Sequence, residues 1–112
     1  MEVEVKDNSA EVLKAFGQQC ILGLKAIGQE AEGYAKEDCP VDTGRLRASI
    51  SNKVEESEKA VYIGTNVEYA PYVEYNDNAA HPTGKAHFLR DAATTHSEHY
   101  KQIMEAALKG GS

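Results

Sequence analysis

The amino-acid sequence predicts an α+β fold in which a small antiparallel sheet packs against two long helices and one short helix. Two long stretches repeat apolar residues every three or four positions, as helices do. Between them, two segments rich in β-branched and aromatic residues flank a polar turn, which is typical of a hairpin. The chain has 112 residues, the length of one domain, and we expect that domain to cover residues 1–109, with a flexible end at 110–112.

The N-terminus supplies a third strand to this predicted sheet. Val3 and Val5 alternate with Glu2 and Glu4, and a period of two residues indicates a strand with one polar face. We expect this strand to lie at an edge of the sheet.

A long helix is predicted from Ser9, a good N-cap residue, to about Glu37. The residue before a proline is disfavoured in the α region, so the pair Cys39-Pro40 ends it. Four glycines interrupt the helix, and each costs about 1 kcal/mol relative to alanine. They predict close approach of another backbone, from this chain or from a second copy, with a bend as the alternative. The apolar stripe consists of Val12, Leu13, Phe16, Cys20, Leu24, Ile27, Ala31 and Tyr34. The four glycines are Gly17, Gly23, Gly28 and Gly33.

The stretch "CPVDTGRLRASI", from Cys39 to Ile50, is predicted to join this helix to the hairpin. It contains a single glycine, whereas a phosphate-binding loop needs several so that backbone N–H groups can converge on the ligand. We therefore expect Asp42 or Thr43 to cap a brief turn, Gly44 to permit its backbone, and Leu46 to re-enter the core.

The hairpin is expected from about Ser49 to Asn66, with Ile50 and Val54 pointing inward and a polar turn at "EESEK". A short helix should follow it, because Pro71 is tolerated in a first helical turn.

A loop dense in Asn, Asp, Gly and Pro comes next, and then one long helix from about His87 to Leu108. The stripe expected for this last helix is Leu89, Ala92, Ala93, His96, His99, Tyr100, Ile103 and Ala107.

The charge and hydropathy of the chain argue against some classes of function. Eighteen acidic residues against twelve basic ones give a net charge of −6, which argues against a general nucleic-acid binder. As an alternative, a basic patch of Arg45, Arg47, Lys53 and Lys59 near aromatic residues could bind single-stranded nucleic acid by stacking on its bases. No apolar run approaches the roughly 20 residues of a membrane span.

The sequence contains no recognisable catalytic signature, and we expect neither an enzyme nor a cofactor. Cys20 and Cys39 have no CxxC spacing and are expected to be free thiols. His96 and His99 share a helix face, and His81, His87 and Asp91 are near in sequence, which is compatible with a metal site. Because His96 and His99 fall on or beside the apolar stripe, we favour packed or solvated histidines. We expect no metal.

Four tyrosines, at positions 62, 69, 72 and 75, fall within fourteen residues. Tyr and Arg are the residue types enriched at interface hot spots. The plainer interpretation is that two of the four belong to the core. The candidate interface residues are Arg45, Arg47, Tyr72 and Tyr75.

Three separated stretches resemble one family, the tail components of long-tailed phages and prophages, which are small neck proteins associated with head–tail joining or tail completion. "CPVDTGRLRASI" resembles its helix-to-strand signature, "YIGTNVEYAPYVEYN" its second signature, and "HFLRDAA" the start of its last helix. The resemblance covers residues 39–93 closely, and the whole chain by order and length. The matching positions are Pro40, Asp42, Thr43, Gly44, Leu46, Ser49, Gly64, Tyr69, Ala70, Val73, Glu74, Phe88, Leu89 and Arg90. The chain departs from the family at Asn76, where glycine is usual, and at His87 and Asp91, where prolines are common.

The resemblance implies a structural virion protein without a catalytic site or cofactor. Its expected partners are copies of itself in an oligomeric ring, whose isolated subunits can be monomeric, and neighbouring head-closure, neck and tail-tube proteins. It implies a place in the virion neck or tail, with assembly in the host cytoplasm, and no membrane or specific nucleic-acid partner. A tail terminator is the nearest alternative, and a small nucleic-acid-binding regulator is a more distant one.

Overall fold

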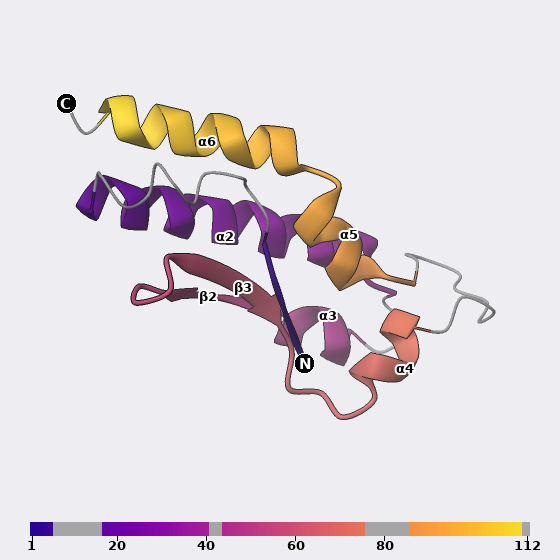
Figure 1. The fold of residues 1–112 in the computed structure, drawn as a ribbon. Helices are drawn as coiled ribbons and strands as arrows, with labels where there is room; N and C mark the ends of the chain where they lie inside the picture. The colour runs from indigo at the N-terminus through magenta and orange to yellow at the C-terminus, as the bar shows by residue number, and fades with distance from the viewer. Residues whose placement is uncertain (6–16, 41–43, 76–85, 111–112) are drawn as a thin grey trace.

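The computed structural model describes residues 1–5, 17–40, 44–75 and 86–110 of the chain. It confirms the α+β fold, with a three-stranded antiparallel sheet and several helices (Figure 1). The elements in chain order are β1 Glu2–Glu4, α2 Gln18–Asp38, α3 Arg45–Ser49, β2 Ser51–Glu55, β3 Ala60–Gly64, α4 Ala70–Tyr75, α5 Phe88–Thr94 and α6 Ser97–Gly110. Within these residues, no helix is both long enough and apolar enough to cross a bilayer.

The sheet has the strand order β1-β3-β2, so the predicted N-terminal strand is confirmed at an edge. Glu2 pairs with Gly64, which in turn pairs with Ser51 across the sheet. A Cβ on Gly64 would lie 2.7 Å from the Glu2 Cβ, so the missing side chain is what lets β1 approach β3 this closely. The N-terminal ammonium donates to the Thr65 carbonyl at 3.0 Å and holds the end of β1 in place.

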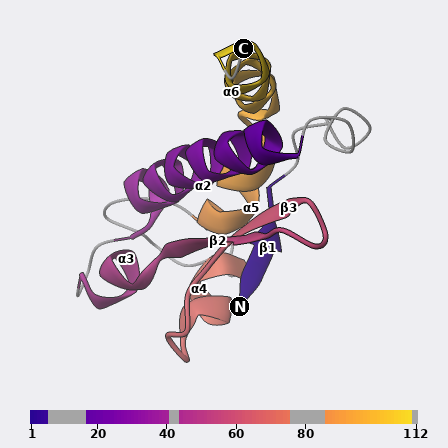
Figure 2. The ribbon, with the colours of Figure 1, turned by 90° about the vertical axis from the view of Figure 1, so that its left-hand side faces the viewer.

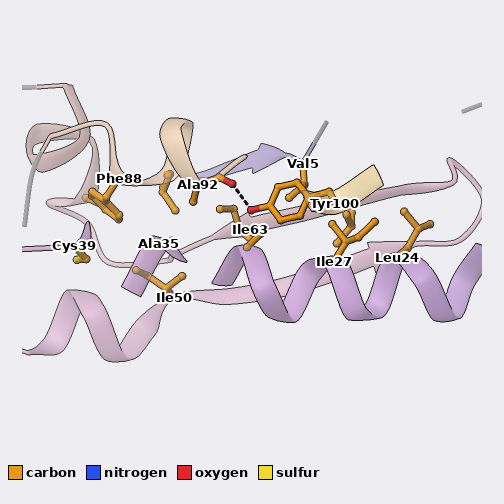
Figure 3. Close-up of a cluster of buried hydrophobic side chains, with 14 of the residues drawn as sticks. Val5, Leu24, Ile27, Ala35, Cys39, Ile50, Ile63, Phe88, Ala92 and Tyr100 are labelled. Carbon is orange, nitrogen blue, oxygen red and sulfur yellow. Dashed lines mark hydrogen bonds between the residues drawn. The ribbon is translucent and has the colours of Figure 1, made fainter. Parts of the chain in front are cut away.

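Helices cover one face of the sheet. In both views α2 lies against the sheet and α6 runs along the outer side of α2 (Figures 1 and 2). The apolar stripe of α2, including Leu24, Ile27, Ala31 and Ala35, is fully buried between these layers. Val61 and Ile63 on β3 face it from the sheet and are also fully buried. The core therefore fills the space between the sheet and the helices (Figure 3).

The end of α2 agrees with its prediction. Cys39 has the extended backbone that precedes a proline, and its N–H donates to the Ala35 carbonyl at 2.9 Å. The predicted beginning at Ser9 and the first turns of the stripe lie outside the described residues, and so do Asp42, Thr43 and the loop at 76–85.

Two of the four glycines of the predicted helix meet close neighbours, but those neighbours are side chains of the same chain and not a backbone. A Cβ on Gly23 would lie 2.6 Å from the Met104 sulfur, and one on Gly28 would lie 2.8 Å from the Asn52 side-chain oxygen. A Cβ on Gly33 would meet open space. Gly17 precedes the first residue of α2 with a positive φ of 51°.

The predicted single C-terminal helix is two helices, α5 and α6, which is a correction. The hydroxyl of Thr94 donates to the Arg90 carbonyl at 2.9 Å, a bond that competes with the helical ladder near the break. Tyr100 reaches back across the break and donates to the Ala92 carbonyl (Figure 3). The bend lets α5 pack on β1 and β3 while α6 follows α2, which one straight helix could not do.

The joint from Cys39 to Ile50 also differs from its prediction. It contains a short helix, α3, where a brief turn was expected, and β2 begins only at Ser51. Gly44 precedes α3 with a left-handed φ of 74°, which confirms that this position needs glycine. Ile50 is buried as predicted, but it is the residue that follows α3 and is not part of the strand.

Candidate functional site

The three motifs of the resemblance meet in the part of the molecule where α3, α4 and α5 lie. The first contact joins the first motif to the second. The guanidinium of Arg45 donates two hydrogen bonds to the Glu68 carboxylate, at 3.2 and 3.0 Å, and lies 5.5 Å from the ring centre of Tyr69. The pair is exposed, so salt screens it, but its bidentate geometry fixes the direction of Arg45.

A second contact joins the same two motifs through hydroxyl groups. Ser49 Oγ donates to the Leu46 carbonyl at 2.7 Å and lies 2.5 Å from Thr65 Oγ1. Because the Ser49 hydroxyl has one proton, the Thr65 hydroxyl donates in the second bond. Thr65 Oγ1 also accepts from the Val67 N–H at 3.1 Å. This chain of bonds closes the end of α3 against the residues that follow β3.

The third contact joins the second motif to the third through Glu74. This side chain is 1% exposed, yet it is a carboxylate. Its two oxygens accept from the N–H groups of Leu89, at 2.8 Å, and Arg90, at 3.2 Å. Its own carbonyl accepts from the His87 N–H at 2.8 Å. Glu74 therefore binds the first turn of α5 twice through its side chain and fixes the preceding residue through its backbone.

Glu74 replaces a local helix cap. The first N–H groups of any helix have no partner inside it, and a side chain at the N-cap usually accepts from them. His87 holds the N-cap position of α5 in a left-handed conformation, with φ 61°, and its side chain makes no capping bond. Burial raises the pKa of Glu74, while the bonds from Leu89 and Arg90 oppose that rise.

Most other motif residues build the core. Leu46, Ala70, Phe88 and Leu89 are all buried, and Val73 packs against the same cluster. This explains the motif positions as structural, with Glu74 as the buried polar residue among them. Sequence reasoning missed Glu68 and Thr65 as partners of Arg45 and Ser49, because each partner is separated from its motif residue by a strand or more.

The candidate interface residues lie on the surface. Tyr72 and Tyr75 are 67% and 64% exposed, which is unusual for side chains this large. Arg47 is exposed as well. Tyr62 and Tyr69 are half-buried, and Tyr69 packs against the core. Of these four tyrosines, the two of α4 are the more exposed.

The histidines of the last stripe pack against aromatic neighbours. His96 stacks on Tyr34 with ring centres 3.6 Å apart, and His99 lies near the carboxylate of Glu30, at 4.0 Å. Among the described residues, no three His, Cys, Asp or Glu side chains gather as metal ligands. The metal alternative therefore has no geometry to support it in this part of the chain.

The two cysteines are free thiols, as predicted, and both are buried. Burial raises the pKa of Cys39 to about 11. A thiol with such a pKa is protonated at neutral pH, and the thiolate is the nucleophilic form. The environment of Cys39 is that of a packed side chain.

A family model matches residues 4–75 and carries the description "Bacteriophage HK97-gp10, putative tail-component". This chain belongs to that family. The match covers more than half of the chain and includes the first motif and all but the last residue of the second, whereas the third motif, at Phe88, lies beyond it. Neither a search of curated proteins nor a search of solved structures found a match.

Family membership gives the general function. The chain is a structural tail component of a phage, so its place is the virion and its partners include other virion proteins.

Proposed function

We propose that this protein is a neck subunit that joins the phage head to the tail, or completes the tail, by assembling into a ring of identical copies. In this proposal residues 1–109 form one domain, the neighbours are head-closure, neck and tail-tube proteins, and assembly takes place in the host cytoplasm. The observation that carries the proposal is the family match over residues 4–75.

The use of the motif residues supports the same function. Glu74, Leu46 and Phe88 are buried in the fold, whereas Tyr72 and Tyr75 are among the exposed residues nearby. Large aromatic side chains such as these are enriched at protein–protein interfaces, where a partner covers their apolar surface. We propose that the protein acts by binding and not by catalysis.

Inactivating the gene in its parent phage or prophage tests the proposal. We expect electron micrographs of the lysate to show filled heads and separate tails of normal length, and a plasmid copy of the gene should restore joined particles. Tails of abnormal length would instead assign the protein as a tail terminator. Joined, infectious particles without the gene product would overturn both assignments.

A further inference from the structure

The face of the sheet that points away from α2 carries several acidic side chains. Alternation along the strands puts Glu2 and Glu4 of β1 on this face together with Tyr62 of β3. The hairpin adds further carboxylates at its end. We call this set the acidic sheet face: Glu2, Glu4, Glu55, Glu56 and Glu58.

No described helix covers this face (Figures 1 and 2). Five glutamates stand against Lys53, Lys59 and the N-terminal ammonium of Met1 in the same strands and turn, so the formal charge of the face is negative. Lys53 is already bound to Glu55 at 2.6 Å. The Tyr62 hydroxyl donates to Glu58 at 2.7 Å, and this bond, with the negative charge of Glu58, Glu4 and Glu2, raises the pKa of Tyr62 to about 12.

The acidic sheet face is also hollowed at one end. A depression of about 340 Å³ lies at the end next to α3, and its lining includes Glu2, Ser49 and Tyr62 together with the cationic Met1 and Lys53. Glu55, Glu56 and Glu58, near the hairpin turn, are not among the residues that line it.

All three arginines of the chain lie elsewhere, in α3 and at the start of α5. Arg45 is bound to Glu68 and Arg90 to Asp91, whereas Arg47 is exposed and its side chain makes no hydrogen bond or ion pair with the described residues. In both views α3 lies beyond the end of the hairpin that is opposite its turn (Figures 1 and 2).

We propose that the acidic sheet face of one copy binds the α3 surface of the next copy, with Arg47 against the glutamates of the hairpin. This rests on the proposed ring and names the two surfaces that would form it. Two different surfaces at opposite ends of the hairpin give a head-to-tail contact, which closes into a ring when the rotation between copies allows it.

The size of the face sets the expected strength. Three strands of three to five residues span roughly 10 Å by about 17 Å. The area that these two lengths enclose is well below the roughly 800 Å² that each partner buries in a stable interface. A single contact is therefore weak, and a closed ring is needed for stability. Because charge drives the contact, salt should weaken it.

Sedimentation velocity up to about 1 mM protein, near the weak end of measurable affinity, tests the contact at low and high salt. The variants are Arg47→Glu and Glu56→Lys, which reverse one charge on each surface. Their controls are Lys101→Glu and Glu105→Lys, which make the same charge changes on the exposed side of α6. We expect salt-sensitive association of the wild type, at least tenfold weaker association in each variant, and no such loss in the controls.

Mixing the two variants gives the decisive result. The mixture contains one intact Arg47 surface and one intact Glu56 surface, and the reversed residues also complement each other. Association should therefore return although neither variant associates alone. Two variants that associate like the wild type, or a mixture that fails to recover, would overturn this contact while leaving the ring itself in place.

A wild-type chain that stays monomeric at low salt would overturn the contact as well, because the contact as argued needs no other protein. The proposed function would then still be decided separately, by the micrographs of the phage that lacks the gene.

Discussion

At the scale of single residues, Glu74 is the side chain on which the motif-bearing end depends most. Burying a carboxylate is costly unless its oxygens are bonded, and here each oxygen accepts from a backbone N–H of α5. The residue also explains why two motifs that are separate in the sequence belong together. One motif supplies the carboxylate and the other supplies the helix that it caps.

Replacing Glu74 by glutamine should destabilise the fold by about 1–3 kcal/mol, the cost of leaving a buried polar group unsatisfied. The glutamine side chain has a single acceptor oxygen, so one of the two N–H groups would face an amide nitrogen. Urea denaturation measures the change. Glu105→Gln, on the exposed side of α6, is the control and should change the free energy of unfolding little.

The raised pKa of Glu74 also predicts how the stability of the protein changes with pH. Burial, which outweighs the bonds to Leu89 and Arg90, raises the pKa of Glu74 above its ordinary value of 4.5. The folded state therefore binds this proton more tightly than the unfolded state, and its contribution to stability falls as the pH rises through the interval between those two pKa values. The difference in unfolding free energy between wild type and Glu74→Gln should shrink over that interval. A difference that grows with pH would contradict the prediction.

At the scale of elements, α2 shows how neighbours decide the effect of a glycine. Gly28 and Gly33 lie in the same helix and have the same low helix propensity. One is buried against Asn52 and Val61, and the other faces open space.

Substitution by alanine should therefore act in opposite directions at these two positions. Gly33→Ala should stabilise the protein by about 1 kcal/mol through helix propensity. Gly28→Ala should destabilise it by about 1–3 kcal/mol, because the added methyl group would displace Asn52, which donates to Glu32 at 2.8 Å. Thermal unfolding of the two variants measures both effects, and a stabilised Gly28→Ala would show that the sheet can move away from α2.

The short helix α3 gives a second prediction at this scale. Gly44→Val should lower stability by about 1–2 kcal/mol, because a β-branched residue is strained at the left-handed φ of 74°. Any loss of self-association should follow this loss of stability. Unchanged melting together with lost association would instead make Gly44 part of a contact surface.

At the scale of the whole molecule, the acidic balance predicts that the protein does not bind duplex DNA. With 18 acidic residues against 12 basic ones, long-range repulsion opposes approach to phosphates. A fluorescence titration at low salt should show no binding at micromolar protein concentration. A salt-dependent complex in that range would favour the nucleic-acid-binding alternative over a neck protein.

The sequence by itself determined the edge strand, the long helix and its end before Pro40, the hairpin, the short helix after it, and the need for glycine at position 44. These depend on local backbone preferences and on apolar periodicity, which act between neighbours in the chain. It also indicated the family, through three short motifs.

The tertiary structure decided the rest. At the break between α5 and α6, Tyr100 bonds across it to Ala92 and Thr94 bonds back within α5 to Arg90. The roles of Glu68, Thr65 and Glu74 follow from contacts over many residues of sequence. Periodicity carries no information about which distant groups meet. The sequence does not distinguish a buried carboxylate from an exposed one, and only the fold shows which backbone N–H groups surround it.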